Sequence, residues 1–148
     1  MLRFNSIENE EPRKKKPSTV FTSKTIVAPD PTDPQYFYPA QPTDDAQGIC
    51  GEEIRATDTD FTSDRRIAVD FPVNDSDEFE AVVTGAVASS GYENQTFDVD
   101  ATDAEKVDIS TSGTQFIYMR TVDSSATVPD RNVAIFRFNR GAGPAINS

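Results

Sequence analysis

The sequence predicts an all-β protein, with a small β-sandwich or β-barrel body preceded by a long extended N-terminal arm. From about residue 65, short runs of β-branched and aromatic residues alternate with polar residues between turn signals. Seven of the ten prolines lie before residue 43, and the apolar residues there show no helical spacing. We therefore expect an arm and linker over residues 1–64, a β-rich body over 65–140 and a tail over 141–148.

The strands expected in the body follow one another at short intervals, about five or six in all. The first covers residues 67–73, where every second residue is apolar and Pro72 suits an edge strand. The segment "EFEAVVTGAVASSGY" comes next, then "TFDV" and "KVDIS" around an acidic turn, and finally "QFIYMRTV" and "NVAIFRFNR". We find no internal repeat of fixed period. The side chains expected to point inward are Ile67, Val69, Phe71, Val83, Val87, Phe97, Val99, Phe116, Tyr118, Ile135 and Phe136.

The arm contains one basic run, "PRKKKP", made of Arg13, Lys14, Lys15 and Lys16. Three interpretations stay open. The run can contact nucleic acid, it can dock on an acidic protein surface, or it can have no specific role, because nearby glutamates almost balance its charge. We favour a protein partner over nucleic acid for this cluster.

The arm also contains three small apolar groups, which are separated by polar residues or prolines. A proline-stiffened chain of this kind cannot bury its apolar groups against itself, and it loses little entropy when it docks on a partner. We therefore expect each group to fill a pocket on a neighbouring subunit. The groups are Val20 with Phe21, Ile26 with Val27, and Tyr36 with Phe37 and Tyr38.

The net charge of -11 is concentrated in the middle of the chain. Residues 31–130 contain 21 acidic and 5 basic side chains, and such a surface repels phosphate, so nucleic-acid binding by the body is not expected. The scarce cations of the body should pair with carboxylates, and they are Arg65, Arg66, Arg137 and Arg140. No apolar run reaches the roughly 18 residues of a membrane span, and no export signal is evident, so we expect synthesis in the cytoplasm.

The residues that usually carry catalysis or bind metals are scarce. The chain has no histidine, and its single cysteine, Cys50, has no nearby base, so we expect no zinc site and no nucleophile. The segment "DVDATDAE" has oxygen-ligand spacing for calcium, but it lacks the glycine of an EF-hand loop. Alternate residues of a strand share a face, so Asp98 and Asp100 are better explained as a solvent face. We expect no enzyme, no metal and no cofactor.

A compact acidic β-domain with a long N-terminal arm resembles the small proteins that decorate and cement the capsids of tailed bacteriophages. The resemblance is carried by the arm up to Asp64 and by the strands in "EFEAVVTGAVASSGYENQTFDVDATDAEKVDISTSGTQFIYMRTV". It implies a structural protein of the virion surface that binds the major capsid protein or other virion subunits, often as a trimer or another homo-oligomer. Two alternatives stay open, a neck or tail connector and a fibre-associated binding module.

Overall fold

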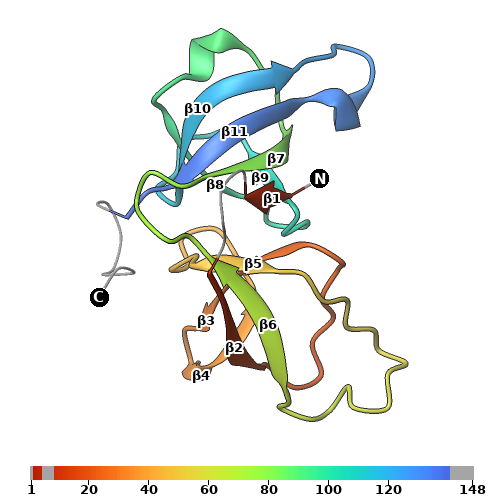
Figure 1. Ribbon diagram of the computed structural model, residues 1–148. Coiled ribbons are helices and arrows are strands. Elements are labelled where there is room, and N and C mark those ends of the chain that lie inside the picture. Colours follow the sequence, from red (N-terminus) through yellow and green to blue (C-terminus); the bar gives the residue numbers. More distant parts are fainter. Residues whose placement is uncertain (1, 5–8, 141–148) are drawn as a thin grey trace.

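The computed structural model describes residues 2–4 and 9–140, and its strands form two packed all-β units (Figure 1). The all-β class is confirmed, since the described residues contain strands and two 3-10 turns but no α-helix. The strands are β1 (Arg3–Phe4), β2 (Asn9–Lys15), β3 (Thr25–Asp30), β4 (Asp33–Pro39), β5 (Gly48–Cys50), β6 (Arg66–Phe71), β7 (Glu78–Thr84), β8 (Thr96–Val99), β9 (Lys106–Asp108), β10 (Phe116–Asp123) and β11 (Val133–Phe138). The turns are η1 (Ser90–Tyr92) and η2 (Pro129–Arg131).

The first unit is a closed barrel with the strand order β2–β4–β3–β5–β6. Its interior is a small apolar cluster, to which the loops also contribute: Phe21 and Ile54 form a β-bridge and are both fully buried. The other members of the cluster are Val27, Phe37, Cys50, Ile67 and Val69. Strand β6 therefore completes this first barrel and does not begin a separate body.

The prediction of an extended arm over residues 1–64 is wrong for the part of this segment that the structure describes. Residues 9–50 hold four strands of the first barrel, and the predicted boundary at residue 65 moves to the connection between β6 and β7, residues 72–77. Burial explains the error in the apolar pattern. Ile26 faces the second unit and Val27 faces the barrel interior, so β3 is buried on both sides and shows no alternation. The tail, residues 141–148, lies outside the described residues.

The second unit is a ring of five strands, β7–β11–β10–β8–β9, which closes because β9 also pairs with β7. Strand β1 lies outside this ring and pairs with the first half of β7, with Phe4 opposite Phe79. Leu2 is 1% exposed, and the Phe4 ring lies about 6 Å from those of Phe79 and Phe138. The N-terminal strand therefore belongs to the second unit, although the strand that follows it belongs to the first.

The two rings have the same topology. In each, the first strand is parallel to the third, β2 to β4 and β7 to β9, and every other neighbouring pair is antiparallel. A backbone hydrogen bond also recurs at the same place: the amide of Lys15 donates to the Arg65 carbonyl at 3.0 Å, and the amide of Val83 donates to the Asn132 carbonyl at 2.9 Å. Lys15 and Val83 are therefore equivalent positions of a fold that occurs twice in the chain.

The outer face of the first barrel packs into the core of the second unit, while the interior of the first barrel is a separate apolar cluster. Ile26 and Ala28 of β3 and Ile49 of β5 pack against the aromatic cluster of the second unit. The amide of Ile26 donates to the Ala104 carbonyl at 2.8 Å, which links the first barrel to the loop between β8 and β9. Such contacts fix the two units against each other.

Most residues expected to point inward are buried, but two are not fully so. Phe71 is half-buried beside the core of the first barrel. The prediction for Val87 is wrong, since it is 44% exposed. Strand β7 ends at Thr84, and Gly85 has φ +88°, a conformation that breaks the alternation which the sequence pattern extended to residue 87.

Three of the four arginines expected to pair with carboxylates do so. Arg65 pairs with both Glu52 and Asp60, Arg137 lies 4.0 Å from Glu78, and Arg140 lies 3.4 Å from Asp75. Arg66 is exposed and has no ion pair among the described residues. Its pairing stays a prediction about a partner.

Candidate interaction surface

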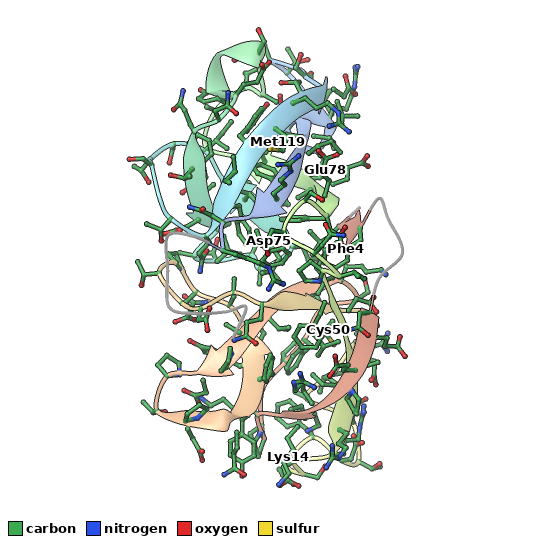
Figure 2. The ribbon with its side chains drawn as sticks, turned by 60° about the vertical axis from the view of Figure 1, so that its left-hand side comes forward. Phe4, Lys14, Cys50, Asp75, Glu78 and Met119 are labelled. Carbon is green, nitrogen blue, oxygen red and sulfur yellow. The ribbon has the colours of Figure 1, made fainter. Side chains whose placement is uncertain are left out.

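The side chains of the basic run contact other residues of the first barrel, so less of their surface is available to a partner. The Arg13 guanidinium lies 4.6 Å from the centre of the Phe71 ring and 5.7 Å from that of Phe37. Lys14 lies at the end of the barrel away from the second unit (Figure 2), 3.8 Å from Asp64. Both side chains keep some exposed surface, so a partner contact at these two residues stays a prediction.

Lys15 is fully buried, so the expectation that it docks on a partner is wrong. Its ammonium donates to the carbonyls of Phe61 at 3.1 Å and Ser63 at 2.6 Å. Burial lowers the pKa of Lys15, and the nearby charge of Asp60 opposes that shift. This side chain holds the long loop between β5 and β6, residues 51–65, over the end of the barrel.

Lys16 forms a close ion pair with Asp30, with 2.8 Å between the ammonium and the carboxylate. The Asp30 side chain is 6% exposed. Hydrogen bonds from Lys16 and from the Thr32 amide lower the pKa of Asp30 to about 2. The Lys16 ammonium also lies 5.2 Å from the centre of the Tyr38 ring, so the last residue of the basic run stabilises the barrel edge.

The seven residues of the three apolar groups differ in burial. Four of these residues lie in the chain's own core and cannot dock on a neighbour in this conformation, so that prediction is wrong for Phe21, Ile26, Val27 and Phe37. Tyr36 and Tyr38 are half-buried, and Val20 is 53% exposed. Val20 lines a cavity of about 390 Å³ between the two units.

The acidic clusters serve as loop caps. Asp98 accepts hydrogen bonds from the amides of Thr114 and Gln115, and Asp100 accepts one from the Thr102 amide. Among the residues that the structure describes, no group of three or more such side chains could hold a metal ion. The single thiol is equally confined: Cys50 lies inside the first barrel (Figure 2), where burial raises its pKa to about 11.

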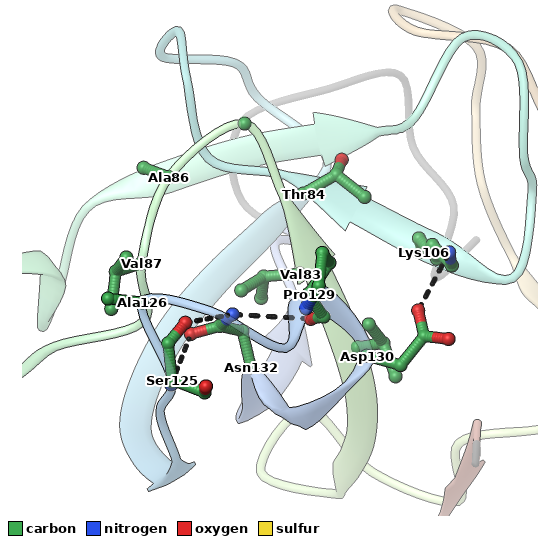
Figure 3. A pocket seen from close by; sticks show the side chains of 12 residues that line it. Val83, Thr84, Ala86, Val87, Lys106, Ser125, Ala126, Pro129, Asp130 and Asn132 are labelled. Carbon is green, nitrogen blue, oxygen red and sulfur yellow. Dashed lines mark hydrogen bonds and ion pairs between the residues drawn. The ribbon is translucent and has the colours of Figure 1, made fainter.

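An open recess remains on the second unit, and we call it the β7 groove. It consists of two adjoining cavities of about 260 and 290 Å³, which share Val82, Lys106 and Asp130. Its floor is the outer face of β7, and its walls are the loop after β7 and the loop between β10 and β11 (Figure 3).

The walls of the β7 groove are held in place by Asn132, which is 5% exposed. Its side-chain oxygen accepts from the amide of Ala88 at 3.1 Å. The same oxygen accepts from the Ser125 amide at 3.0 Å, and the amide nitrogen donates to the carbonyls of Ser125 and Pro129 (Figure 3). One buried side chain thus joins both loops. At the turn after β7, a Cβ on Gly85 would lie 2.6 Å from Asp108 and Ser110 atoms, so the turn requires glycine.

The β7 groove is apolar at one end and charged at the other. The apolar end is formed by Ala86, Val87, Ala126 and Pro129. At the charged end, Lys106 lies 3.6 Å from Asp103 and 3.4 Å from Asp130. Burial would lower the pKa of Lys106, but these two carboxylates outweigh it and raise that pKa. The arrangement suits an apolar side chain and a charged one at neighbouring positions of a ligand.

This groove was not predicted from the sequence, although one signal was present. The segment "TVDSSATVPDRN" is rich in turn-forming residues. The loop within it supplies to the groove Ser125, Ala126, Pro129, Asp130 and Asn132. Val122 and Val128 in this segment are 52% and 45% exposed, but neither lines the groove. No sequence pattern marks Asn132 as the residue that joins two loops.

Comparisons of the chain with protein-family models, with curated proteins and with solved structures found no match. In the part of the chain that the structure describes, no helix has the length and apolar character needed to cross a membrane.

Proposed function

We propose that this protein is a structural component of a bacteriophage virion, which binds the capsid surface and stabilises the shell through protein contacts. The observation that carries the proposal is the β7 groove. There, Val87 stays 44% exposed beside Ala126 and Pro129, although Asn132 joins both surrounding loops by hydrogen bonds. A preorganised apolar recess of this kind favours a protein partner, because little entropy is lost on binding. The partner is the major capsid protein or another virion subunit.

The roles of the polar side chains support a structural protein rather than an enzyme. Asp98 and Asp100 cap loops, Lys15 caps the end of a barrel, and the Cys50 thiol is buried with a raised pKa. Each of these groups stabilises the fold. The fold itself also favours a scaffold, since two barrels that pack together through a buried apolar face form a stiff body.

The number of copies in each particle tests the proposal. We expect quantitative mass spectrometry of purified particles to find hundreds of copies, as a protein repeated over a capsid requires. About six or twelve copies per particle would place the protein in the neck or tail, where rings have those symmetries. Absence from the particles would overturn the proposal.

A pair of variants tests the groove. Val87→Asp places a charge at the apolar end, and we expect it to abolish rebinding of purified protein to particles that lack it. Val122→Asp is the matched control, because Val122 is 52% exposed on β10 and does not line the groove. Both variants should retain the stability of the parent protein within about 0.5 kcal/mol, since each side chain is exposed. Equal rebinding of the two variants would exclude the groove as the contact.

A further inference from the structure

We infer that the β7 groove binds an extended segment of a partner protein in which an apolar and a basic side chain are two residues apart. The inference rests on the proposed function, because it names the chemistry of the partner at the same site. Its starting point is the shape of the groove, two adjoining cavities with three residues in common. Alternate side chains of an extended segment project on one side about 7 Å apart, which suits two neighbouring recesses.

The charged end of the groove has an excess of negative charge. Lys106 is the one cation among the described residues that line it, and it faces the carboxylates of Asp103 and Asp130. Glu105 lines the same cavity, and its carboxylate has no ion pair within the described part of the chain. The Asp130 side chain is 80% exposed, so its carboxylate is accessible from solvent. Two carboxylates beside one ammonium, with Glu105 on the wall of the same cavity, leave an excess of negative charge for a second cation, which the partner supplies.

The apolar end of the groove determines the second side chain that the partner must supply. Val87 and Ala126 offer aliphatic surface without an exposed backbone strand edge, because β7 pairs with β9 on one side and with β11 on the other. Binding there comes from side-chain burial and not from main-chain hydrogen bonds. An aliphatic side chain of a partner is therefore the group that fits.

The net charge of the chain decides between a foreign partner and a second copy. A second copy would bring another net charge of -11 toward a groove that is already negative, and an anionic ligand such as a phosphate would be repelled in the same way. A basic segment of a different protein is attracted, and its association should weaken as salt is added.

Three synthetic hexapeptides test the inference in titrations of the isotope-labelled full chain, followed by backbone amide NMR shifts at low ionic strength. The first has leucine and arginine two residues apart in a glycine-serine background. The second replaces arginine with glutamate, and the third replaces leucine with serine. We expect the first peptide alone to shift the amides of Ala86, Val87 and Asp130, with an affinity at least tenfold above the other two.

A variant that neutralises two carboxylates of the groove tests the same charge interaction from the side of the protein. Glu105→Gln combined with Asp130→Asn should lower the affinity for the leucine-arginine peptide about tenfold. Equal binding of the leucine-glutamate peptide overturns the inference, as do shifts spread equally over the acidic loop of residues 51–65. If the unliganded protein self-associates in sedimentation and Val87→Asp prevents it, a second copy is the occupant and the inference is wrong. The copy number in particles is measured independently, so each proposal can fail while the other stands.

Discussion

The two barrels have one topology but are stabilised in different ways. The second unit is built around contacting aromatic rings, with Phe79 at 5.1 to 5.8 Å from those of Phe116, Phe136 and Phe138. The first barrel has a smaller apolar cluster, and a fully buried lysine, Lys15, stands where the second has Val83. This strand order therefore does not require one kind of interior. Local polar contacts can replace part of an apolar core, and the two halves then share no visible sequence pattern.

The largest loss of stability is expected from a substitution in the aromatic cluster of the second unit. Phe79 is fully buried and packs against four other rings, so Phe79→Ala should cost about 3 to 5 kcal/mol of unfolding free energy. Urea denaturation measures it. The matched variant is Phe71→Ala in the first barrel, where the ring is half-buried and the loss should be clearly smaller. Equal losses would contradict the view that aromatic packing matters more in the second unit.

A smaller loss of unfolding free energy is expected when the buried Lys15 is replaced by an apolar residue, as stands at the equivalent position of the second unit. Lys15→Met keeps most of the side-chain volume but removes the donor to the Ser63 carbonyl and one of the two donors to the Phe61 carbonyl. The Phe61 carbonyl also accepts from the Ser18 amide at 2.8 Å. The loss of these hydrogen bonds should cost about 1 to 3 kcal/mol. Limited proteolysis should then cut residues 51–65 faster than in the parent protein. Unchanged stability together with unchanged cleavage would show that the lysine is not needed to hold this loop.

The smallest effect concerns acid stability of the first barrel. The folded-state pKa of Asp30 is about 2, below its ordinary value of 3.8, so its ion pair with Lys16 stabilises the protein above about pH 4. That contribution is lost as the pH falls from about 4 toward 2. Asp30→Asn should therefore cost about 1 to 2 kcal/mol at pH 6 and almost nothing at pH 2. Chemical denaturation at both pH values measures it, and a difference that is independent of pH would contradict the assignment.

The strands of the second unit could be predicted from the sequence because each is buried on one face. Phe79, Ala81 and Val83 alternate with half-buried residues, which is the period of a strand with one inner face. β10 has the same property in its first half, and β11 has it in its second half, where Phe136 and Phe138 are buried on either side of the half-buried Arg137. The strand pattern there depends on neighbours in the sequence and needs no knowledge of distant contacts.

The first barrel could not be predicted because its pattern depends on distant contacts. β3 is buried on both faces by parts of the chain that lie far away in sequence, and it therefore appears as a short apolar run. Pro12 on β2 also suggested an arm. The first half of β2 pairs with β6 on one side, and its pairing with β4 begins only at Lys14, so a residue without an amide hydrogen is tolerated there.

The groove could not be predicted either, because its parts meet only in the folded chain. Lys106 and Asp130 are 24 positions apart, and Asn132 bonds to Ala88 across 44 positions. Of the residues expected to bind partners, Val20, Tyr36 and Tyr38 retain open surface, but none of them lines the β7 groove. Sequence patterns report local periodicity and charge, whereas this site depends on two loops joined by one buried amide.

The position of β1 gives the chain an order that a simple string of two domains would not have. The second unit takes its outermost strand from residues 3–4 and its remaining strands from residues 78–138, so the whole first barrel is an insert within it. A protease cut in residues 72–77 would therefore not release the first barrel, because the barrel remains fastened through Leu2 and Phe4, which are packed in the core of the second unit. An insert attached at both ends cannot swing freely on a single linker. Load applied to one barrel would reach the other through two separate connections.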